Sequence, residues 1–599
     1  MESEFKNYLL TFKLPKLVFT NLYFFWKAFY RKIRNLFFSQ NNYSKFKLIN
    51  RHRKKILKKS YPICQIKSQN FKKSYKLKLV TGFINIKSNS DWHKKYDDIE
   101  LRVSLDRWNW LIVGQNNHLF PFDFNDGVFL IRSWASQFIN DKDLAKNEPY
   151  CVGERISNAI LFFKLNNYKI PDDILTVLKK LTFQLTQNLE YFKDGLTGNH
   201  AFNNSRALYL VSDYLIDDDI RSLALEIAKE RLEKLITADG FLREGSSHYQ
   251  FIFTRWVLEM IWSAESRKDK EAINVLKPYC EKLLKNCWVF LVKDQNNKWS
   301  FPLYGDVSPD CTPEWLMSLT WSKIACNIYR PERVPIAPKN VGWANLFGII
   351  DQTKQHYNKL KINFSSNCGW HRLDFYDWTF FTYTPKKANY IKATHAHLDL
   401  CSFSLFYKGK PIIIDIGRFD YTNSSISKYG KSVRSHNSLE INNLGPETDL
   451  YSWMNPSYSK IKSKLNVNEI ENKTIITINH NGFERIINKK INHKRIISLS
   501  QKEVKIKDVI LGKGKVKVNN FFNFGPDLNL LKKDSKIIKF SNNIDFEINA
   551  ESKKISRSNQ NFSGWMFPSY GTKVPIFSLE LRTLKTLPLT LSNKIIINK

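Results

Sequence analysis

Residues 402–414, SFSLFYKGKPIII, show most clearly which fold this 599-residue chain adopts. Apolar and polar residues alternate through 402–407, Lys408-Gly409 forms a tight turn, and the apolar run 411–414 follows. Period-two alternation beside a two-residue turn predicts an antiparallel β-hairpin. Similar runs rich in β-branched and aromatic residues include 378–383 and 473–478. Residues 346–599 are therefore predicted to form an antiparallel β-sheet sandwich domain.

The preceding region, residues 101–345, has apolar residues at helical rather than strand spacing. The clearest stretches are 129–138, 156–165, 223–236 and 256–261. Short linkers that contain Gly, Pro or Asp separate the stretches, so consecutive helices should run antiparallel. The sequence predicts a multidomain α and β protein in which an all-α domain of stacked helical hairpins precedes the β domain.

Residues 1–100 form a basic N-terminal region. Residues 1–80 carry 20 lysines and arginines against two glutamates, which is a large part of the formal net charge of +37. Residues 14–38 can form an amphipathic helix that lies on a membrane surface, or a helix that packs on its own domain. The apolar part is too short to span a bilayer, and no cleavable signal peptide is evident. We expect a bacterial protein in the cytoplasm or at the inner membrane, with the periplasm as the alternative.

The positive charge fits an anionic partner, although a solvated lysine-rich surface explains it equally well. No zinc-finger spacing, RNA-recognition signature or basic zipper accompanies it, so nucleic acid is not expected. A membrane surface or an acidic polysaccharide fits better. The eight cysteines contain no CxxC pair and read as ordinary core thiols.

Residues 395–399, HAHLD, bring two histidines and an aspartate to one face if they form a strand. Imidazole and carboxylate groups are ligands that zinc prefers, although such a segment can also be a polar strand face. Asp415 ends the buried run 411–414, and His436 lies within 434–438, RSHNS. Hairpin pairing places Asp415 opposite Ser402, about 16 Å from His397, so a bulge or a fold-back would be needed to gather these residues.

Two polar clusters in the helical region lie at predicted helix N-termini. Residues 198–200, GNH, precede one helix, and 243–249, REGSSHY, precede another. Helix N-termini favour anions, so a rim that gathers both could hold an anionic ligand. Asn199 could equally be a helix cap, and Tyr249 a core aromatic residue.

These motifs, in this order, resemble the heparinase II/III family of polysaccharide lyases. Residues 198–200 look like the family's Asn-His element, 239–249 like its catalytic-tyrosine loop, and 395–405 like its HxHxD strand. Residues 415–417 and 434–438 look like its Asp-x-Gly and Ser/Ala-His-Asn segments. The resemblance implies an incomplete α/α toroid followed by antiparallel β-sheets.

The resemblance also implies site roles. Asn199 and His200 would neutralise a uronate carboxylate, Tyr249 would act as general base or acid, and His395 would carry the complementary proton transfer. A structural zinc would be bound by His397, Asp415 and His436.

Three functions follow as hypotheses. The first is a lyase that cleaves an acidic, uronate-containing glycan by β-elimination, in processing of the cell's own capsule or lipopolysaccharide. The second is a non-catalytic glycan-binding or assembly factor. The third, ranked last, is a metal-dependent glycan hydrolase, because all three ligand positions are already filled by protein.

Overall fold

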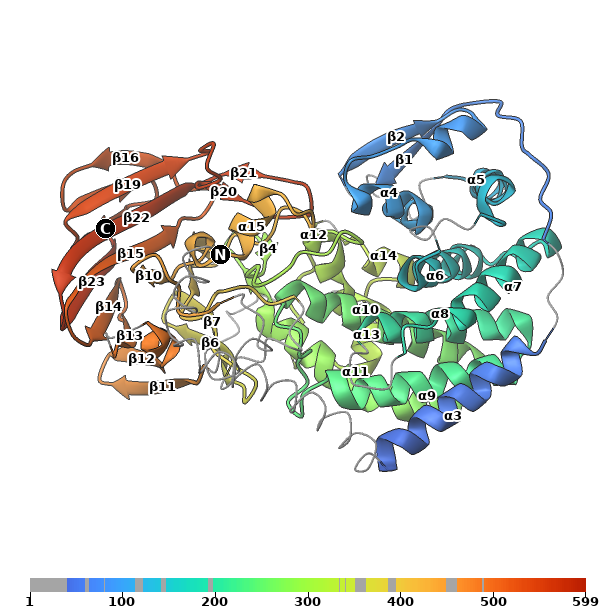
Figure 1. The fold of residues 1–599 in the computed structure, drawn as a ribbon, viewed down its shortest axis with the longest axis horizontal. Helices are drawn as coiled ribbons and strands as arrows, with labels where there is room; N and C mark the ends of the chain where they lie inside the picture. The colour runs from blue at the N-terminus through green and yellow to red at the C-terminus, as the bar shows by residue number, and fades with distance from the viewer. Residues whose placement is uncertain are drawn as a thin grey trace, which may run out of the picture.

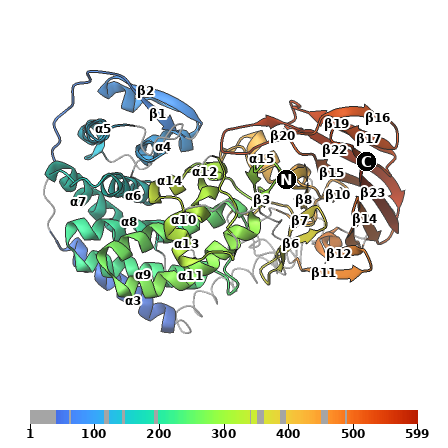
Figure 2. The ribbon, with the colours of Figure 1, turned by 180° about the vertical axis from the view of Figure 1, so that it is seen from behind.

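The computed structural model describes residues 40–59, 64–79, 81–113, 122–141, 147–191, 198–332, 334–339, 341–350, 362–385, 395–448, 461–486 and 490–598. The predicted amphipathic segment 14–38 lies outside these residues. A helical half and a β half lie side by side in both views (Figure 1, Figure 2). The predicted fold class is confirmed: helices come first, and antiparallel sheets follow.

The helices of the first half pack both against their neighbours in sequence and against the helices beyond them. They are α3 (Gln40–Leu57), α4 (Ile99–Asp106), α5 (Phe124–Phe138), α6 (Pro149–Leu165), α7 (Asp172–Gln187), α8 (His200–Leu215), α9 (Asp218–Leu235), α10 (Ser247–Arg267), α11 (Lys270–Phe290), α12 (Pro313–Met317), α13 (Lys323–Ile328) and α14 (Ala344–Phe347). Helix α8 packs against α6 and α9, and α10 packs against α11 and α8. None of the helices in the described ranges is long and apolar enough to cross a membrane.

A buried ion cluster fixes the helices that carry candidate site residues. Glu154 on α6 forms ion pairs with Arg206 of α8 and Arg255 of α10, each at 2.9 Å, and all three side chains are buried. Removing one member would leave an uncompensated buried charge, which typically costs about 3–5 kcal/mol. The cluster therefore holds the register of α6, α8 and α10.

Helix α10 begins at a conventional cap, whereas α8 does not. The Ser246 hydroxyl accepts a hydrogen bond from the Tyr249 backbone N–H at 3.2 Å. Asn199 stands at the N-cap of α8 without a side-chain cap hydrogen bond. The alternative in which Asn199 serves as a helix cap is thus wrong, and its amide points elsewhere.

The strands form three larger sheets in the second half. The first has the order β5 (Asn363–Ser365), β6 (Trp370–Phe375), β7 (Trp378–Tyr383), β8 (Phe403–Tyr407) and β9 (Lys410–Ile413). The second has the order β11 (Ser463–Ile470), β12 (Lys473–His480), β13 (Asn492–Leu499), β14 (Glu503–Leu511), β23 (Leu589–Ile597), β18 (Ile544–Glu547), β17 (Ile537–Phe540) and β16 (Leu530–Lys533). The third has the order β10 (Leu439–Ile441), β15 (Lys515–Asn523), β22 (Phe577–Thr586) and β19 (Ser552–Arg557).

The described structure also contains smaller elements. They are the pairs β1 (Tyr75–Leu79) with β2 (Gly82–Ile86), β3 (Val292–Lys293) with β4 (Trp299–Ser300), and β20 (Trp565–Met566) with β21 (Val574–Pro575), together with helix α15 (Ser425–Lys431). The predicted hairpin is confirmed, since Tyr407 pairs with Lys410 across Lys408-Gly409.

The first sheet joins the two halves through aromatic packing. The Trp370 ring on β6 lies 5.0 Å from the Phe290 ring of α11 and 5.7 Å from the Tyr304 ring. These residues belong to one core that extends from the helices into β6 and β7, while a second core fills the space among the sheets. The junction between the halves is therefore packed and holds residues from both in fixed positions.

Candidate functional site

Three backbone segments meet closely where the two halves join. A Cβ placed on Gly245 would lie 2.7 Å from the Ala396 Cβ, and one placed on Gly305 would lie 2.5 Å from the His395 carbonyl oxygen. Both glycines have positive φ angles, +71° and +70°, that other residues rarely adopt. The Asp306 backbone N–H also donates to the His395 carbonyl at 2.9 Å. This contact brings the start of α10, the segment around Asp306 and the HAHLD segment together.

Asn199 and His395 meet at the carboxylate of Glu244. The Asn199 amide nitrogen donates to Glu244 Oε2 at 2.7 Å and lies 3.4 Å from His395 Nε2. His395 Nε2 lies 3.2 Å from the same Glu244 oxygen. Asn199 and Glu244 are buried, and the His395 side chain is only 13% exposed. An amide, an imidazole and a carboxylate thus converge on one small volume.

Tyr249 lies flat against His395. Their ring centroids are 3.6 Å apart with 16° between the planes, and the two hydroxyl oxygens of Tyr249 and Tyr421 are 3.0 Å apart. Burial raises the pKa of Tyr249 well above its usual value, and the hydrogen bond with Tyr421 opposes this only in part. The phenol is therefore protonated at neutral pH and suited to donate a proton.

Asp306 connects three basic side chains beneath the site. Its carboxylate accepts from His395 Nδ1 at 3.0 Å, from His397 Nε2 at 2.9 Å and from Arg418 Nη1 at 2.8 Å. Burial opposes ionisation, but the two histidine hydrogen bonds and the Arg418 charge hold the pKa of Asp306 well below its usual range. A permanent carboxylate here directs Nδ1–H of His395 toward Asp306 and leaves Nε2 facing Asn199.

His200 contacts two glutamates. Its Nδ1 lies 3.0 Å from Glu190 Oε1 and 3.8 Å from Glu148 Oε1, and its side chain is 44% exposed. Burial lowers its pKa, but Glu190 and Glu148 outweigh that effect and raise it overall. The structure therefore brings Asn199, Tyr249 and His395 together and turns His200 toward two glutamates.

The predicted metal ligands are neighbours, but not all in the expected roles. The His397 and His436 rings are 5.4 Å apart, and both are buried. The Asp415 carboxylate accepts a hydrogen bond from His436 Nδ1 at 2.9 Å. Asp415 is therefore a hydrogen-bond partner of the His436 ring. Nδ1 of His397 and Nε2 of His436 are buried without a hydrogen-bond partner.

The surroundings of these two nitrogens resemble those of metal-bound histidines. Each ring gives its other nitrogen to a carboxylate, Asp306 or Asp415, which is the usual arrangement around metal-bound histidines. Burial lowers the pKa of His397 to about 4, against the opposing hydrogen bond with Asp306, so the ring is neutral at physiological pH. Asp399 has a buried oxygen without a hydrogen-bond partner, and burial together with Glu447 and Asp415 raises the pKa of its carboxyl well above the usual value.

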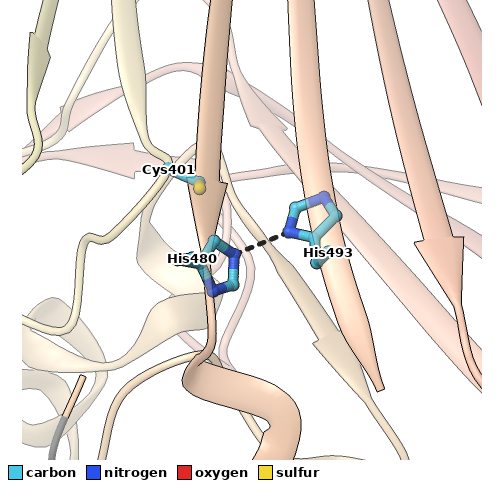
Figure 3. Close-up of side chains that lie close together, drawn as sticks. All are labelled: Cys401, His480 and His493. Atoms are coloured by element: carbon cyan, nitrogen blue, oxygen red, sulfur yellow. Dashed lines mark hydrogen bonds between the residues drawn. The ribbon is translucent and has the colours of Figure 1, made fainter. Parts of the chain in front are cut away.

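A second group of possible ligands, Cys401, His480 and His493, is closer together but already satisfied. Figure 3 shows the two rings joined by a hydrogen bond of 2.7 Å beside the Cys401 sulfur. His493 Nε2 donates to Asp508 at 2.8 Å, and His480 Nδ1 accepts the Gly482 N–H at 3.1 Å. If a metal bound His480 Nε2, the ring proton would have to move to Nδ1, where it would face the Gly482 N–H instead of accepting from it. The group therefore serves as a hydrogen-bonded brace between β12, β13 and β14.

The HAHLD segment is not a strand, contrary to the sequence-based expectation. Residues 395–401 turn, with the Ser402 N–H donating to the Asp399 carbonyl and Cys401 at φ +67°. The Ser402 hydroxyl does reach Asp415 at 3.3 Å, as the hairpin pairing requires. The fold-back thus places His395 against the helical half while His397 turns inward.

Sequence reasoning gave no role to Glu244, Asp306, Arg418 or Tyr421. Glu244 stood within the quoted REGSSHY motif, so its position beside Tyr249 was an available signal. Asp306 had none, because its partners lie 89, 91 and 112 residues away along the chain.

His248, next to Tyr249, makes the fold sensitive to acid. Burial and the nearby Arg255 charge lower its pKa to about 3, and its Nδ1 accepts the Ser308 N–H at 3.0 Å. An unfolded histidine titrates near 6.5, so below that pH only the unfolded chain gains a proton. This histidine should reduce the free energy of unfolding by about 1.4 kcal/mol per pH unit between about pH 6.5 and pH 3.

We expect the melting temperature of the His248→Asn variant to fall less steeply than that of the wild type as the pH is lowered. The variant lacks the titrating ring, and its side-chain oxygen can still accept the Ser308 N–H. The exposed His93 provides a control, since His93→Asn should leave the slope as it is. Equal slopes for the wild type and His248→Asn would contradict the assignment.

The chain is similar to one protein family in sequence and to several solved structures in fold. Residues 360–591 match the family model described as heparinase II/III-like, C-terminal. The crystal structure of heparinase III aligns with a TM-score of 0.61 at 16% identity, over 84% of this chain and 79% of that one. A mutant of the heparan sulfate lyase HepC from Pedobacter heparinus aligns with a TM-score of 0.53 at 15% identity, over 93% of this chain and 89% of that one.

A search of the curated proteins finds no significant match to this sequence. The family match covers the β half, and the structural alignments extend through both halves. The chain therefore has the fold of heparinase III, and its residues 360–591 match the heparinase II/III-like C-terminal family model.

Proposed function

We propose that this protein is a polysaccharide lyase that cleaves an acidic, uronate-containing glycan by β-elimination. The observation that carries the proposal is the junction of the two halves, where Asn199, Tyr249 and His395 come together although 196 residues separate the first from the last. The heparinase II/III-like family match and the heparinase III fold support the same reaction class.

The proposed reaction removes the proton beside the uronate carboxylate and breaks the glycosidic bond at the neighbouring carbon. The electrons of the C–H bond form a carbon–carbon double bond, and the glycosidic oxygen leaves with its bonding pair. A base must take the first proton, an acid must protonate the leaving oxygen, and donors must stabilise the charge that develops on the carboxylate. Asn199 is the donor that the geometry offers for the last task.

His395 suits the role of base, and Tyr249 that of acid. Asp306 accepts from His395 Nδ1, so the Nε2 lone pair can take a proton, and the same carboxylate stabilises the imidazolium that results. The raised pKa of Tyr249 keeps its phenol protonated until the glycosidic oxygen develops negative charge. The sequence left open which residue is the base and which is the acid, and we propose His395 as the base and Tyr249 as the acid.

The test is the ultraviolet absorbance of the unsaturated product, with a panel of acidic glycans as substrates. We expect Tyr249→Phe and His395→Ala each to lower turnover by at least roughly 100-fold, because each removes one proton-transfer group. Tyr168→Phe, at a half-exposed tyrosine, is the matched control and should retain activity. Products that gain water instead of a double bond, seen by mass spectrometry, would identify a hydrolase.

We further propose a structural zinc held by His397 Nδ1 and His436 Nε2, with Asp306 and Asp415 orienting the rings. Zinc would lock the turn that carries His395 and supply no Lewis acid to the substrate. Elemental analysis of the purified protein should find zinc in the wild type and in His395→Ala, but not in His397→Ala or His436→Ala. Equal metal content in all four proteins would rule out this site.

The biological context is proposed as processing of the cell's own surface polysaccharide, in the cytoplasm, at the inner membrane or in the periplasm. The basic N-terminal region supports it, since α3 exposes lysines and arginines while Lys59 pairs with Asp217, the N-cap of α9, at 2.7 Å. Flotation with anionic vesicles, comparing the full chain with a chain that lacks residues 1–50, tests membrane association.

A further inference from the structure

Glu244 occupies the centre of the site at the junction of the two halves. It is 2% exposed and immediately precedes Gly245, whose close approach to Ala396 presses this segment onto HAHLD. The backbone on either side is fixed, because Arg243 N–H donates to the Leu235 carbonyl and Ser246 caps α10. The Glu244 carboxylate is therefore held in place by its backbone as well as by its own contacts.

Both groups proposed to face the substrate meet one oxygen of this carboxylate. Asn199 Nδ2 lies 2.7 Å and His395 Nε2 lies 3.2 Å from Glu244 Oε2. These are the distances at which an amide and an imidazole would contact a uronate carboxylate. In the free protein, the position suited to the substrate's anionic group is filled by an anionic group of the chain.

We propose that Glu244 determines specificity by competing with the carboxylate of the glycan for the Asn199 amide, beside the Nε2 atom of His395. The inference rests on the proposed function, because the uronate carboxylate is the ligand that this amide would bind. Two carboxylates cannot share one amide donor in a buried, low-dielectric position without strong repulsion. A substrate must therefore displace Glu244, and only a glycan with enough other contacts can do so.

The competition has a measurable signature, because it depends on the charge of the ligand. Glu244→Gln keeps the length of the side chain and an oxygen that can accept the Asn199 N–H, but it removes the negative charge. We expect this substitution to tighten the binding of an anionic glycan about tenfold or more, which corresponds to 1.4 kcal/mol. A glycan without carboxylates should bind both proteins equally.

The experiment measures equilibrium binding by calorimetry in the Tyr249→Phe background, so that the ligand is not consumed. The probes are unsulfated heparosan and alginate tetrasaccharides and their carboxyl-reduced, neutral counterparts. The control is Glu314→Gln, which changes the net charge by the same amount at an exposed glutamate on α12, away from the site. Melting temperatures show that each variant is folded, and Glu244→Ser removes the charge by a second route if the glutamine variant unfolds.

Tighter binding of the acidic probes alone, without an effect of Glu314→Gln, supports the competition. Unchanged or weaker binding of the acidic probes to a folded Glu244 variant overturns it, as does the same gain for the neutral probes. Absence of binding to both the parent and the variant also counts against it. The ultraviolet assay is independent: tighter binding without turnover would refute the lyase proposal alone, and turnover without tighter binding would refute the competition alone.

Discussion

Asp306→Asn should reduce lyase turnover by roughly 10²–10⁴-fold while leaving a folded protein. An asparagine side chain replaces one acceptor oxygen by an N–H₂ donor and removes the charge. In the native site, Asp306 accepts from His395, His397 and Arg418, so one of these donors would face another donor in the variant. His395 would lose both the tautomer that exposes Nε2 and the anion that stabilises its imidazolium.

The measurement is kcat and KM from the ultraviolet assay, together with the melting temperature. Because Asp306 acts through His395, the loss should fall on kcat rather than on KM. Asp377→Asn, at an exposed turn between β6 and β7, is the matched control and should change neither constant. Full activity of Asp306→Asn would show that the His395 tautomer is set by another group.

Gly305→Ala should strongly destabilise the junction of the two halves. The new Cβ would lie 2.5 Å from the His395 carbonyl oxygen and 2.6 Å from the Gly245 carbonyl oxygen, both of them backbone atoms that cannot rotate away. The φ angle of +70° adds strain for any residue with a Cβ. We expect a loss of about 3 kcal/mol or more.

Thermal unfolding tests this expectation, and the melting temperature should fall by roughly 6–12 °C. Gly198→Ala provides the control, because an added Cβ there meets nothing within 4 Å although Gly198 adjoins Asn199. A folded Gly305→Ala protein with native melting temperature and activity would mean that the three segments can separate without cost.

Sequence patterns predicted the architecture because each pattern reports a local property. Helical spacing in 156–165 and 223–236 corresponds to α6 and α9, and the Lys408-Gly409 turn corresponds to the β8–β9 hairpin. The starts of α8 and α10 were also predicted, since the polar clusters around Asn199 and Tyr249 stand where apolar helical spacing begins.

The same patterns could not predict how the site is assembled. HAHLD has the period-two spacing of a strand, and no glycine or proline within 395–401 indicates that the chain folds back there. The turn is imposed by distant contacts, such as the hydrogen bond from the Leu398 N–H to the Lys431 carbonyl. Likewise, the sequence shows that His397, Asp415 and His436 carry groups that can bind a metal. It does not show which ring nitrogen of each histidine donates to a carboxylate.

The stacking of His395 on Tyr249 ties the proposed proton-transfer pair to the packing of the two halves. One ring belongs to the β half and the other to the helical half, so the pair exists only because the two halves are packed against each other. The same core that stabilises the junction therefore also positions the two groups proposed to move protons. A substitution that loosens this core should lower the proposed activity even where it touches neither ring.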